Sequence, residues 1–516
     1  MILDRTFNQK NQQLTITYID KLGNRQYYQK YLHHIKTYEY NEKGEYLTWD
    51  GKKCDKVFKL SSMYKPTEFD ILEFMYELPE DLRRTMSSPY SPKLYTFDIE
   101  TEVSNEFPEP TLAEQRVTAI ALVGPDLSCI VFGLHSLSEE SKTLFKERYL
   151  DFIKNNEFAS RILKNKFNNK EPKVLYQYFA SEEDLLKHWY NIILPKVPAI
   201  AGWNSYRFDF MYLNNRYSKL FGKAELMNAL RKISPTGETR TIKWDEKIFD
   251  APNRISAPSH TAWLDYMKLC EKYDFILRPY ESFSLDWVSQ AAVKANKIKY
   301  EGTLQQLYER DHEWYYYYNA VDALLVMLIH YRLKCIESPC AVSSVTYVPL
   351  IESMGQVALT TANVFKQFYM DNLHVVWDYD SIARVKQEYE GAFCGCVPGK
   401  YEYNVCCDFA SLYPSQIQTC NLSFENSIYK MSEPDSLGRR FREPWTEQEL
   451  DEFRNDPNYF VSVMGTVYKN DKEYTFKKVQ RSLKKNRDSY KYLGQKIESE
   501  LIAHINKLIE SKENGS

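Results

Sequence analysis

Two acidic side chains near residue 100 have the spacing of a metal-binding pair. Asp98 and Glu100 follow an apolar run that starts at Tyr95, and a single residue separates them. On a β-strand, that spacing places both carboxylates on the same face. Two like charges so close together are costly unless a cation, usually a divalent metal, lies between them. The alternative is a strand that ends in a solvated acidic turn, because Glu102 follows at once.

A third carboxylate is predicted at the start of a helix. The apolar segment 197–201 is typical of a strand, and it runs into Gly202, a polar turn and then a helix that carries Asp209. This order places a carboxylate near the end of a strand. Taken singly, Asp209 is more often an acidic residue that the helix dipole favours.

A fourth carboxylate lies within a long helix that we predict over residues 313–333. Tyr318 and Asp322 are four residues apart, so they share a helix face. The rest of that face is apolar, at Leu325 and Ile329, so Asp322 is expected to point into the interior. A buried, unpaired carboxylate is expensive. Its structural alternative to a metal is a pairing with an arginine or a helix N-terminus elsewhere.

The segments around these carboxylates predict a mixture of strands and helices. Residues 1–92 predict a β-rich opening domain, from the alternation over 14–19, the turn at Gly23 and aromatic strands near Tyr38 and Tyr46. The next part predicts strands over 117–123 and 129–134, charged helices over 138–195 and an extended hairpin over 235–258.

Composition limits the function classes. A chain of 516 residues predicts three or four domains, and with a net charge of −3 any nucleic-acid contact must come from local patches. The 41 tyrosines against 17 glycines fit base-stacking surfaces, but they fit an AT-rich coding sequence better. No apolar run approaches 18 residues and the N-terminus is polar, so we predict neither a membrane span nor a signal peptide. The ten cysteines form no CxxC pair, which predicts buried, reduced thiols.

Together, the four acidic positions resemble the proofreading domain of family-B DNA polymerases, and in detail the T-even bacteriophage branch. The first exonuclease motif is similar to Asp98-Ile99-Glu100, the second to Asn204 through Phe208-Asp209, and the third to Tyr318-x-x-x-Asp322. Three further segments are similar to that branch: Phe107-Pro108-Glu109-Pro110, Ser282-Phe283-Ser284-Leu285-Asp286 and Lys297-Ile298-Lys299-Tyr300-Glu301-Gly302.

The resemblance continues into polymerase sequence. Tyr389-Glu390-Gly391-Ala392 is similar to the YxG(G/A) link that tracks the template, and Asp408-Phe409-Ala410-Ser411-Leu412-Tyr413-Pro414-Ser415 matches motif A. Arg487-Asp488-Ser489-Tyr490-Lys491 resembles the first fingers helix. Motif B, motif C, a thumb and a clamp-binding tail do not follow. We therefore expect one chain of a naturally split polymerase rather than a truncation inside the fingers.

At the exonuclease site, the resemblance implies hydrolysis of a phosphodiester by two Mg²⁺ ions about 3.5–4 Å apart, with Mn²⁺ as a substitute. Asp98, Glu100 and Asp322 are then ligands of the first metal. Asp98 also bridges to the second, which Asp209 supports through water. Tyr318 orients the attacking water, Asn204 and Phe208 position and stack the unpaired primer end, and the hairpin at 235–260 helps to separate the strands.

At the polymerase site, the resemblance implies half of a catalytic centre. Asp408 and the carbonyl of Phe409 bind the metals, and the backbone N–H groups of Ser411, Leu412 and Tyr413 hold the dNTP triphosphate. Tyr413 excludes a 2′-hydroxyl by its bulk. Charged contacts to phosphate come from Arg487 and Lys491, and template contacts from Tyr389 and Gly391. Without a second carboxylate from motif C, the chain is expected to digest single-stranded DNA but not to extend primers.

The expected fold class is α/β and α+β in several domains, with an RNase H-like 3′–5′ exonuclease domain. The expected domains are a β-rich N-terminal domain at 1–92 with a returning segment near 336–378, the exonuclease at 93–335, a partial palm at 379–468 and partial fingers at 469–516. The partners implied are primer-template and single-stranded DNA, dNTP, and a second chain with motifs B and C and a thumb. The location implied is the cytoplasm of an infected bacterial host.

Two other functions remain open at this point. One is a self-sufficient 3′–5′ exonuclease that retains polymerase sequence, and an intact motif A down to Tyr413 counts against it. The other is a non-catalytic DNA-binding scaffold that presents half of a palm. The intact set of acidic residues counts against the scaffold.

Overall fold

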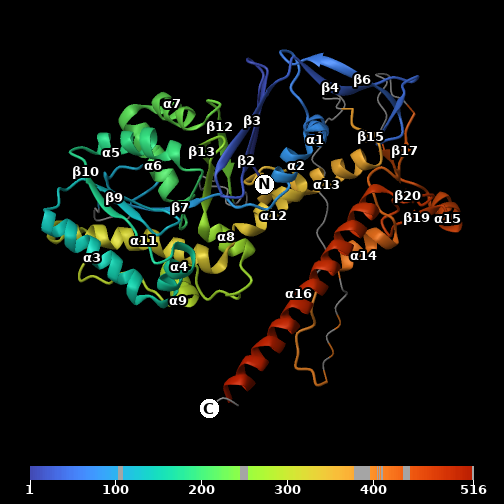
Figure 1. Cartoon of the computed structure of the whole chain (residues 1–516). Coiled ribbons are helices and arrows are strands. Elements are labelled where there is room, and N and C mark those ends of the chain that lie inside the picture. Colours follow the sequence, from blue (N-terminus) through green and yellow to red (C-terminus); the bar gives the residue numbers. More distant parts are fainter. Residues whose placement is uncertain are drawn as a thin grey trace. The chain divides into compact units, whose positions relative to one another are not determined.

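The computed structural model describes most of the chain and divides it into two units (Figure 1). Unit 1 comprises Met1–His33, Leu60–Lys65 and Phe74–Leu359, and unit 2 comprises His34–Lys59, Pro66–Glu73 and Thr360–Ser516. The described residues are 1–102, 108–244, 254–376, 395–403, 405, 407, 411–433 and 442–513, with side chains up to residue 504.

A six-stranded mixed sheet forms the centre of unit 1, in the order β10-β9-β8-β7-β11-β14. The three consecutive strands β7, β8 and β9 are antiparallel neighbours, whereas β10, β11 and β14 pair in parallel with β9, β7 and β11. The strands are β7 (Leu94–Thr101), β8 (Val117–Val123), β9 (Cys129–Gly133), β10 (Val174–Tyr178), β11 (Ala199–Gly202) and β14 (Ala262–Asp265).

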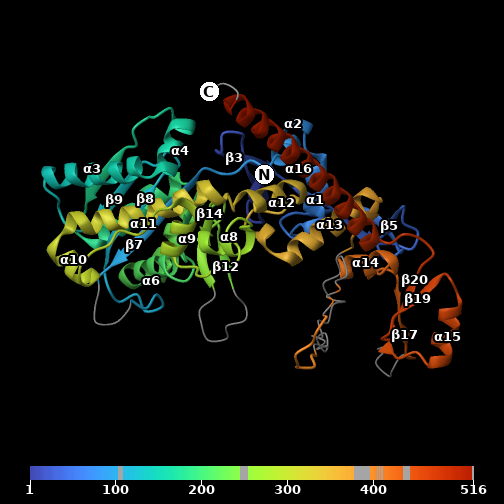
Figure 2. The ribbon, with the colours of Figure 1, turned by 90° about the horizontal axis from the view of Figure 1, so that it is seen from below.

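Helices cover both faces of this sheet (Figure 2), which explains why every residue of β8 is buried. Ala119, Ala121 and Val123 pack into the core that contains α11, and Ile120 and Leu122 pack into the opposite core. The helices are α3 (Glu139–Asn155), α4 (Glu157–Phe167), α5 (Glu182–His188), α6 (Asp209–Phe221), α7 (Lys223–Ile233), α8 (Tyr266–Tyr273), α9 (Leu285–Val293), α10 (Leu304–Arg310) and α11 (His312–Leu333), with short helical turns at Trp189–Ile193 and Leu194–Lys196.

The N-terminal sheet of unit 1 holds a hairpin in place through a buried histidine. Strands β1 (Ile2–Asn8), β2 (Gln13–Ile19) and β3 (Arg25–Tyr31) form this sheet. His260 follows the hairpin strands β12 (Thr239–Lys243) and β13 (Arg254–Pro258), and its ring nitrogens hydrogen-bond the hydroxyls of Thr6 (2.9 Å) and Thr17 (2.8 Å). The unit also contains α2 (Glu80–Met86), α12 (Glu337–Thr346) and a helical turn at Glu352–Met354.

Unit 2 joins early and late segments of the sequence. Strand β15 pairs in parallel with β5, and α13 packs with Tyr38, Phe69 and Cys54 through Val364 and Phe368. Its elements are β4 (His34–Tyr40), β5 (Tyr46–Thr48), β6 (Lys53–Leu60), β15 (Leu373–His374), α14 (Leu412–Thr419), β16 (Ser427–Ile428), β17 (Lys430–Met431), β18 (Arg442–Glu443), α15 (Glu447–Asn455), β19 (Tyr459–Val461), β20 (Val467–Lys469) and α16 (Thr475–Glu513). Helices α1 (Glu68–Glu77) and α13 (Gln356–Met370) each have residues in both units.

The structure confirms the expected fold class, an α/β domain beside a β-rich N-terminal region. The predicted strands over 117–123 and 129–134, the helix over 313–333 and the hairpin arms all form. The prediction of helices throughout 138–195 was wrong, because β10 forms within it. This strand is stable through its pairing with β9, a contact between distant residues that local composition does not reveal.

Two further expectations concern membrane spans and the state of the cysteines. Within the described ranges, no helix combines the length and the apolar composition that crossing a membrane requires. Free thiols are present at every described cysteine, and five of them are buried as expected: Cys54, Cys129, Cys270, Cys335 and Cys340. The exposed Cys396 and Cys407 depart from that prediction.

Gly202 is predicted to be required for the close approach of β11 to β7. A Cβ atom there lies 2.9 Å from the Ser205 Cβ and 3.2 Å from the carbonyl oxygen of Phe97. We expect Gly202→Ala to lower the free energy of unfolding of unit 1 by about 1–3 kcal/mol, because the strands must separate. Denaturant unfolding measures this. The control is Gly494→Ala in α16, where nothing lies within 4 Å and no loss is expected.

Candidate active site

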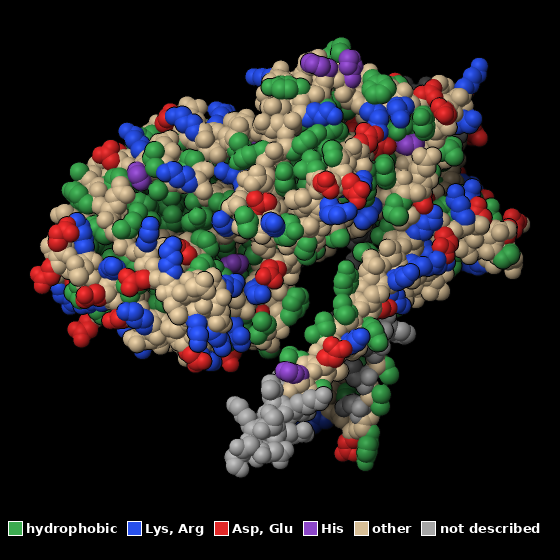
Figure 3. All heavy atoms as spheres, in the orientation of Figure 1, with side chains coloured by type: hydrophobic (Ala, Val, Ile, Leu, Met, Phe, Trp, Pro, Cys, Tyr) green, Lys and Arg blue, Asp and Glu red, His purple; other side chains and the backbone are tan. Residues whose placement is uncertain are grey.

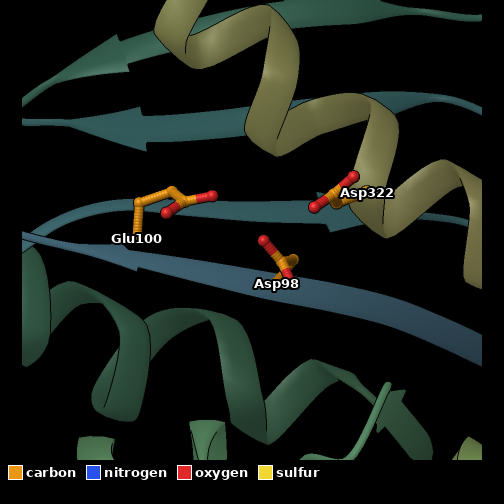
Figure 4. A group of neighbouring side chains, drawn as sticks. All are labelled: Asp98, Glu100 and Asp322. Atoms are coloured by element: carbon orange, nitrogen blue, oxygen red, sulfur yellow. The ribbon is translucent and has the colours of Figure 1, made fainter. Parts of the chain in front are cut away.

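Three carboxylates gather between β7 and α11 (Figure 4). Asp98 and Glu100 project from the same face of β7, as their spacing predicts, and Asp322 projects toward them from α11. One carboxylate oxygen from each residue lies within 4.8 Å of the others. We call Asp98, Glu100 and Asp322 the carboxylate group.

Packing of β7 against α11 fixes the carboxylate group. Phe97 and Ile99 alternate with the acidic residues and are buried in the opposite core. On the side of the carboxylates, the Thr96 hydroxyl donates to the carbonyl oxygen of Ala323 in α11 (2.7 Å). The Asn319 amide, one turn before Asp322, donates to Asp98 Oδ2 (2.8 Å). Hydrogen bonds therefore join the strand to the helix at Asp98 and just before it.

Asp209 lies close by but outside the carboxylate group. It is the first residue of α6, and its Oδ1 accepts a hydrogen bond from the backbone N–H of Ile99 (3.3 Å). That N–H lies between Asp98 and Glu100 in the sequence, so the start of α6 is joined directly to the acidic part of β7. Asp209 also contributes to the repulsion that Asp98 experiences.

Burial and like charge raise the pKa values of these carboxyls. Burial, together with the charges of Asp322 and Glu100, raises the pKa of Asp98 well above its usual range. Burial and the charge of Asp322 raise the pKa of Glu100 to about 8. The pKa of Asp209 is raised to about 7, mainly by burial. A divalent cation bound among these carboxylates would offset both their burial and their mutual repulsion.

Lys297 brings a positive charge to the carboxylate group. Its ammonium lies 2.6 Å from Asp322 Oδ2 and 5.1 Å from the centre of the Tyr318 ring. The backbone N–H of Lys297 donates to Asp286 Oδ1 (2.9 Å), which holds the loop that carries it. We expected an arginine or a helix N-terminus as the protein partner of Asp322, but a lysine pairs with it.

The carboxylate group retains the capacity to bind a metal ion. Asp322 Oδ1 is buried and has no hydrogen-bond partner among the described residues. Oxygen ligands from carboxylates suit Mg²⁺ and similar hard cations. The residues present therefore fit a divalent cation. Burial raises the pKa of the Asp322 carboxyl, while Lys297 and then Tyr318, on the same face of α11, act in the opposite direction.

Asn204 and Phe208 lie in the turn that leads from β11 to Asp209. Asn204 has a left-handed backbone conformation (φ 59°), and its carbonyl oxygen accepts hydrogen bonds from the N–H groups of Arg207 and Phe208. Its side-chain Oδ1 is buried without a partner among the described residues. Phe208 is half-buried. The turn thus brings an unused polar atom and an aromatic ring next to the start of α6.

Residues 54–288 match the family described as "DNA polymerase family B, exonuclease domain". This part of the chain is similar to a family B exonuclease domain. This range contains Asp98, Glu100, Asn204, Phe208 and Asp209.

Curated relatives agree with this assignment. The DNA-directed DNA polymerase of Escherichia phage RB69 is 26% identical over 389 residues, which are 74% of this chain and 40% of that protein. The DNA-directed DNA polymerase of Enterobacteria phage T4 is 29% identical over 334 residues, 64% of this chain and 35% of that protein. DNA polymerase 1 of Sulfurisphaera ohwakuensis is 24% identical over 359 residues, again 64% and 35%. The matches thus span less than half the length of these relatives.

Outside the exonuclease domain, the structure describes only some of the predicted polymerase residues. Tyr389, Gly391, Asp408 and Phe409 lie outside the described residues. Ser411 has a left-handed conformation (φ 55°) directly before α14, which begins with Leu412 and Tyr413. Arg487 and Lys491 are exposed on α16, and α14 packs against that helix.

Removal of the clustered charge is expected to stabilise the metal-free exonuclease domain. In Asp98→Asn/Glu100→Gln, folding no longer buries two carboxyls that ionise freely in the unfolded chain, so the melting temperature without metal should exceed that of the wild type. Mg²⁺ or Mn²⁺ at about a hundredfold excess over the dissociation constant should raise the wild-type melting temperature by roughly 5 °C and leave this variant unchanged. Thermal unfolding with and without EDTA measures both effects.

Glu313→Gln is the matched control for metal binding. Glu313 is a buried acidic residue of α11 whose pKa burial raises to about 7, but it lies outside the carboxylate group. This variant should keep the full metal-dependent increase in melting temperature. Equal responses of wild type and double variant would contradict the assignment of the carboxylate group as the metal site.

Proposed function

We propose that this chain is a 3′–5′ exodeoxyribonuclease that removes nucleotides from the unpaired 3′ end of DNA. The observation that carries the proposal is the carboxylate group, whose oxygens converge within 4.8 Å on a domain of the family B exonuclease type. The relatives' names, DNA-directed DNA polymerase, support DNA as the substrate.

In this proposal, Asp98, Glu100 and Asp322 hold Mg²⁺, for which Mn²⁺ can substitute. When bound, the metal supplies Lewis-acid chemistry and lowers the pKa of water. Asp209 supports a second ion, in keeping with its place outside the carboxylate group. The Tyr318 hydroxyl, which interacts with Asp322, orients the attacking water.

The turn after β11 binds the end of the DNA strand in this proposal. A frayed strand offers unstacked bases and free hydrogen-bonding groups. The Phe208 ring provides a surface for stacking, and the Asn204 amide provides hydrogen bonds. The unpartnered Oδ1 of Asn204 supports this role, because a buried acceptor without a donor is costly in a protein that binds nothing there.

The β12–β13 hairpin separates the primer from the template in this proposal. Its base is fixed by Arg240, which forms ion pairs with Asp4 (3.2 Å) and Glu352 (3.0 Å). Asp4 also accepts a hydrogen bond from the backbone N–H of His260 (2.8 Å). These contacts make the N-terminal sheet a rigid support for the hairpin, as a wedge between two strands requires.

The first test is nuclease activity. With Mg²⁺ and single-stranded DNA labelled at the 5′ end, the chain should produce a ladder of products shortened from the 3′ end. Asp98→Ala/Glu100→Ala should reduce the rate by at least about 10³-fold, because the metal loses two of its ligands. Denaturing gel electrophoresis over time measures the rates.

Glu313→Ala serves as the control for loss of a buried acidic residue of unit 1 that lies outside the site. Its rate should stay close to that of the wild type at a temperature where both proteins are folded. Cleavage by Asp98→Ala/Glu100→Ala at the wild-type rate would show that the site is wrong. DNA binding without any degradation would instead favour the non-catalytic scaffold.

We further propose that the C-terminal part of the chain is half of a polymerase site. The proposed domains are 1–92 with a returning segment near 336–378, the exonuclease at 93–335, a partial palm at 379–468 and partial fingers at 469–516. The residues assigned to metal binding are Asp408 and Phe409, those for dNTP are Ser411, Leu412, Tyr413, Arg487 and Lys491, and those for template are Tyr389 and Gly391.

Helix α16 supports the need for a second chain with motifs B and C and a thumb. Leu483, Tyr490 and Ile497 follow one another at intervals of seven residues, and Leu493 and Leu501 continue the same helix face. All five are exposed, from 45% for Leu483 to 75% for Tyr490. Hydrophobic side chains are visible along this helix in Figure 3. Such an apolar stripe favours a partner helix.

Primer extension tests this second proposal. The chain alone, with primer-template and dNTP, should shorten primers but not extend them. Addition of a polypeptide that carries motifs B and C should give extension, and replacement of both Leu493 and Ile497 of α16 by Asp should reduce the extension at least tenfold by weakening association. Extension by this chain alone would contradict the proposal, and nuclease activity with no response to the partner would favour a self-sufficient exonuclease.

A further inference from the structure

Asp265 joins the turn after β11 to the neighbouring strand. It is the last residue of β14, where it pairs in register with Gly202 of β11, and it is only 2% exposed. Its carboxylate accepts hydrogen bonds from the backbone N–H groups of Asn204 (3.1 Å, Oδ1) and Tyr206 (3.2 Å, Oδ2). Both donors belong to the turn that precedes Asp209.

The same carboxylate also begins a helix. Asp265 is the N-terminal cap of α8 and accepts from the N–H groups of Met267 (3.0 Å) and Lys268 (3.4 Å). A buried carboxylate that accepts four backbone hydrogen bonds is held firmly, because charge-assisted bonds are about twice as strong as neutral ones. The turn is therefore tied to a rigid element, not only to its own residues.

Two more hydrogen bonds join the turn to β14. The Ser205 hydroxyl donates to the carbonyl oxygen of Leu264 (3.1 Å), and the Tyr206 hydroxyl donates to that of Trp263 (2.8 Å). Both acceptors belong to β14. Three consecutive residues of the turn are thus hydrogen-bonded to β14.

These contacts determine how Asn204 is presented. Asparagine adopts this left-handed conformation more readily than most residues other than glycine. The hydrogen bond from the Asn204 N–H to Asp265 helps to hold it, and the Asn204 side-chain Oδ1 is left buried without a donor among the described residues. Such an acceptor is complementary to an N–H or O–H group of a nucleotide.

We propose that Asp265 is a positioning residue for recognition of the 3′ end, acting through the Asn204 amide rather than by contact with the DNA. This rests on the proposed exonuclease function and assigns a role to a residue outside the three exonuclease motifs. The carboxylate of Asp265 fixes the turn so that a donor group on the unpaired nucleotide meets the Asn204 Oδ1.

Asp265→Asn is the principal test. The variant keeps the size of the side chain but replaces one acceptor oxygen by an amide NH₂ donor. The backbone N–H of either Asn204 or Tyr206 then loses its acceptor. The KM for single-stranded DNA should rise about tenfold, the equivalent of one charge-assisted hydrogen bond, and kcat should change less than threefold. Tyr206→Phe, which removes a single hydroxyl, should give a smaller effect in the same direction and covers the case in which Asp265→Asn does not fold.

Coupling to Asn204 separates positioning from a general loss of stability. If Asp265 acts through Asn204, then Asp265→Asn should add less than a twofold increase in KM in the Asn204→Ala background. The control is Asp274→Asn at the other end of α8. Asp274 is also buried and accepts from the N–H groups of Ile276 (2.8 Å) and Leu277 (3.1 Å), but it does not hold the turn. Its KM should stay within twofold of the wild type.

Hydrogen exchange tests the contact between Asp265 and the turn without catalytic turnover. Hydrogen exchange in EDTA should show faster exchange over residues 203–208 in Asp265→Asn, and over residues 275–281 instead in Asp274→Asn. Multiplicative effects of Asp265→Asn and Asn204→Ala on KM, or unchanged protection over 203–208, would overturn the proposal. Absence of DNA degradation by the wild type would overturn the exonuclease function, and the exchange experiment would still decide whether Asp265 holds the turn.

Discussion

Repulsion between buried carboxylates is the constraint on which unit 1 depends. Asp98, Glu100 and Asp322 occupy a place where burial and like charge both raise their pKa values, so their convergence works against folding. Favourable packing elsewhere must therefore compensate for this cost. The cores on both faces of the sheet and the Thr96–Ala323 hydrogen bond between β7 and α11 provide this stabilisation. A metal site of this kind is strained without its ion and is relieved when the ion binds.

Lys297 moderates this strain without removing it. Its ammonium pairs with one oxygen of Asp322, and the other buried oxygen has no hydrogen-bond partner within the described ranges. Its loop is held at Asp286, so the lysine is placed by the backbone and not by the carboxylate alone. A single positive charge offsets only part of the repulsion among three carboxylates. The arrangement therefore stabilises the fold while it leaves oxygen atoms for a divalent cation.

Sequence could predict the parts of the site that depend on local periodicity. The i, i+2 spacing placed Asp98 and Glu100 on one strand face, and the helix period placed Tyr318 and Asp322 together on a face that points inward. It could not predict Lys297, Asn319 or Asp265, because their roles arise from pairs of residues that are far apart in the chain. Strand β10 escaped prediction for the same reason, since pairing with β9 stabilises it. For Asp408 and Phe409, the expectation still rests on sequence alone.

The two kinds of residues at the site are held by different means, and this follows from what each must do. Metal ligands need fixed separations, and Asp98, Glu100 and Asp322 project from a central strand and a buried helix that cannot shift singly. A group that meets a flexible strand end needs an exposed turn, which has no such rigidity of its own. In this chain the turn gains it from β14, through hydrogen bonds to the Asp265 carboxylate and to two carbonyl oxygens. The same turn leads directly into Asp209, whose Oδ1 accepts a hydrogen bond from the backbone of β7, so one short segment links Asn204 and Phe208 to the carboxylate group.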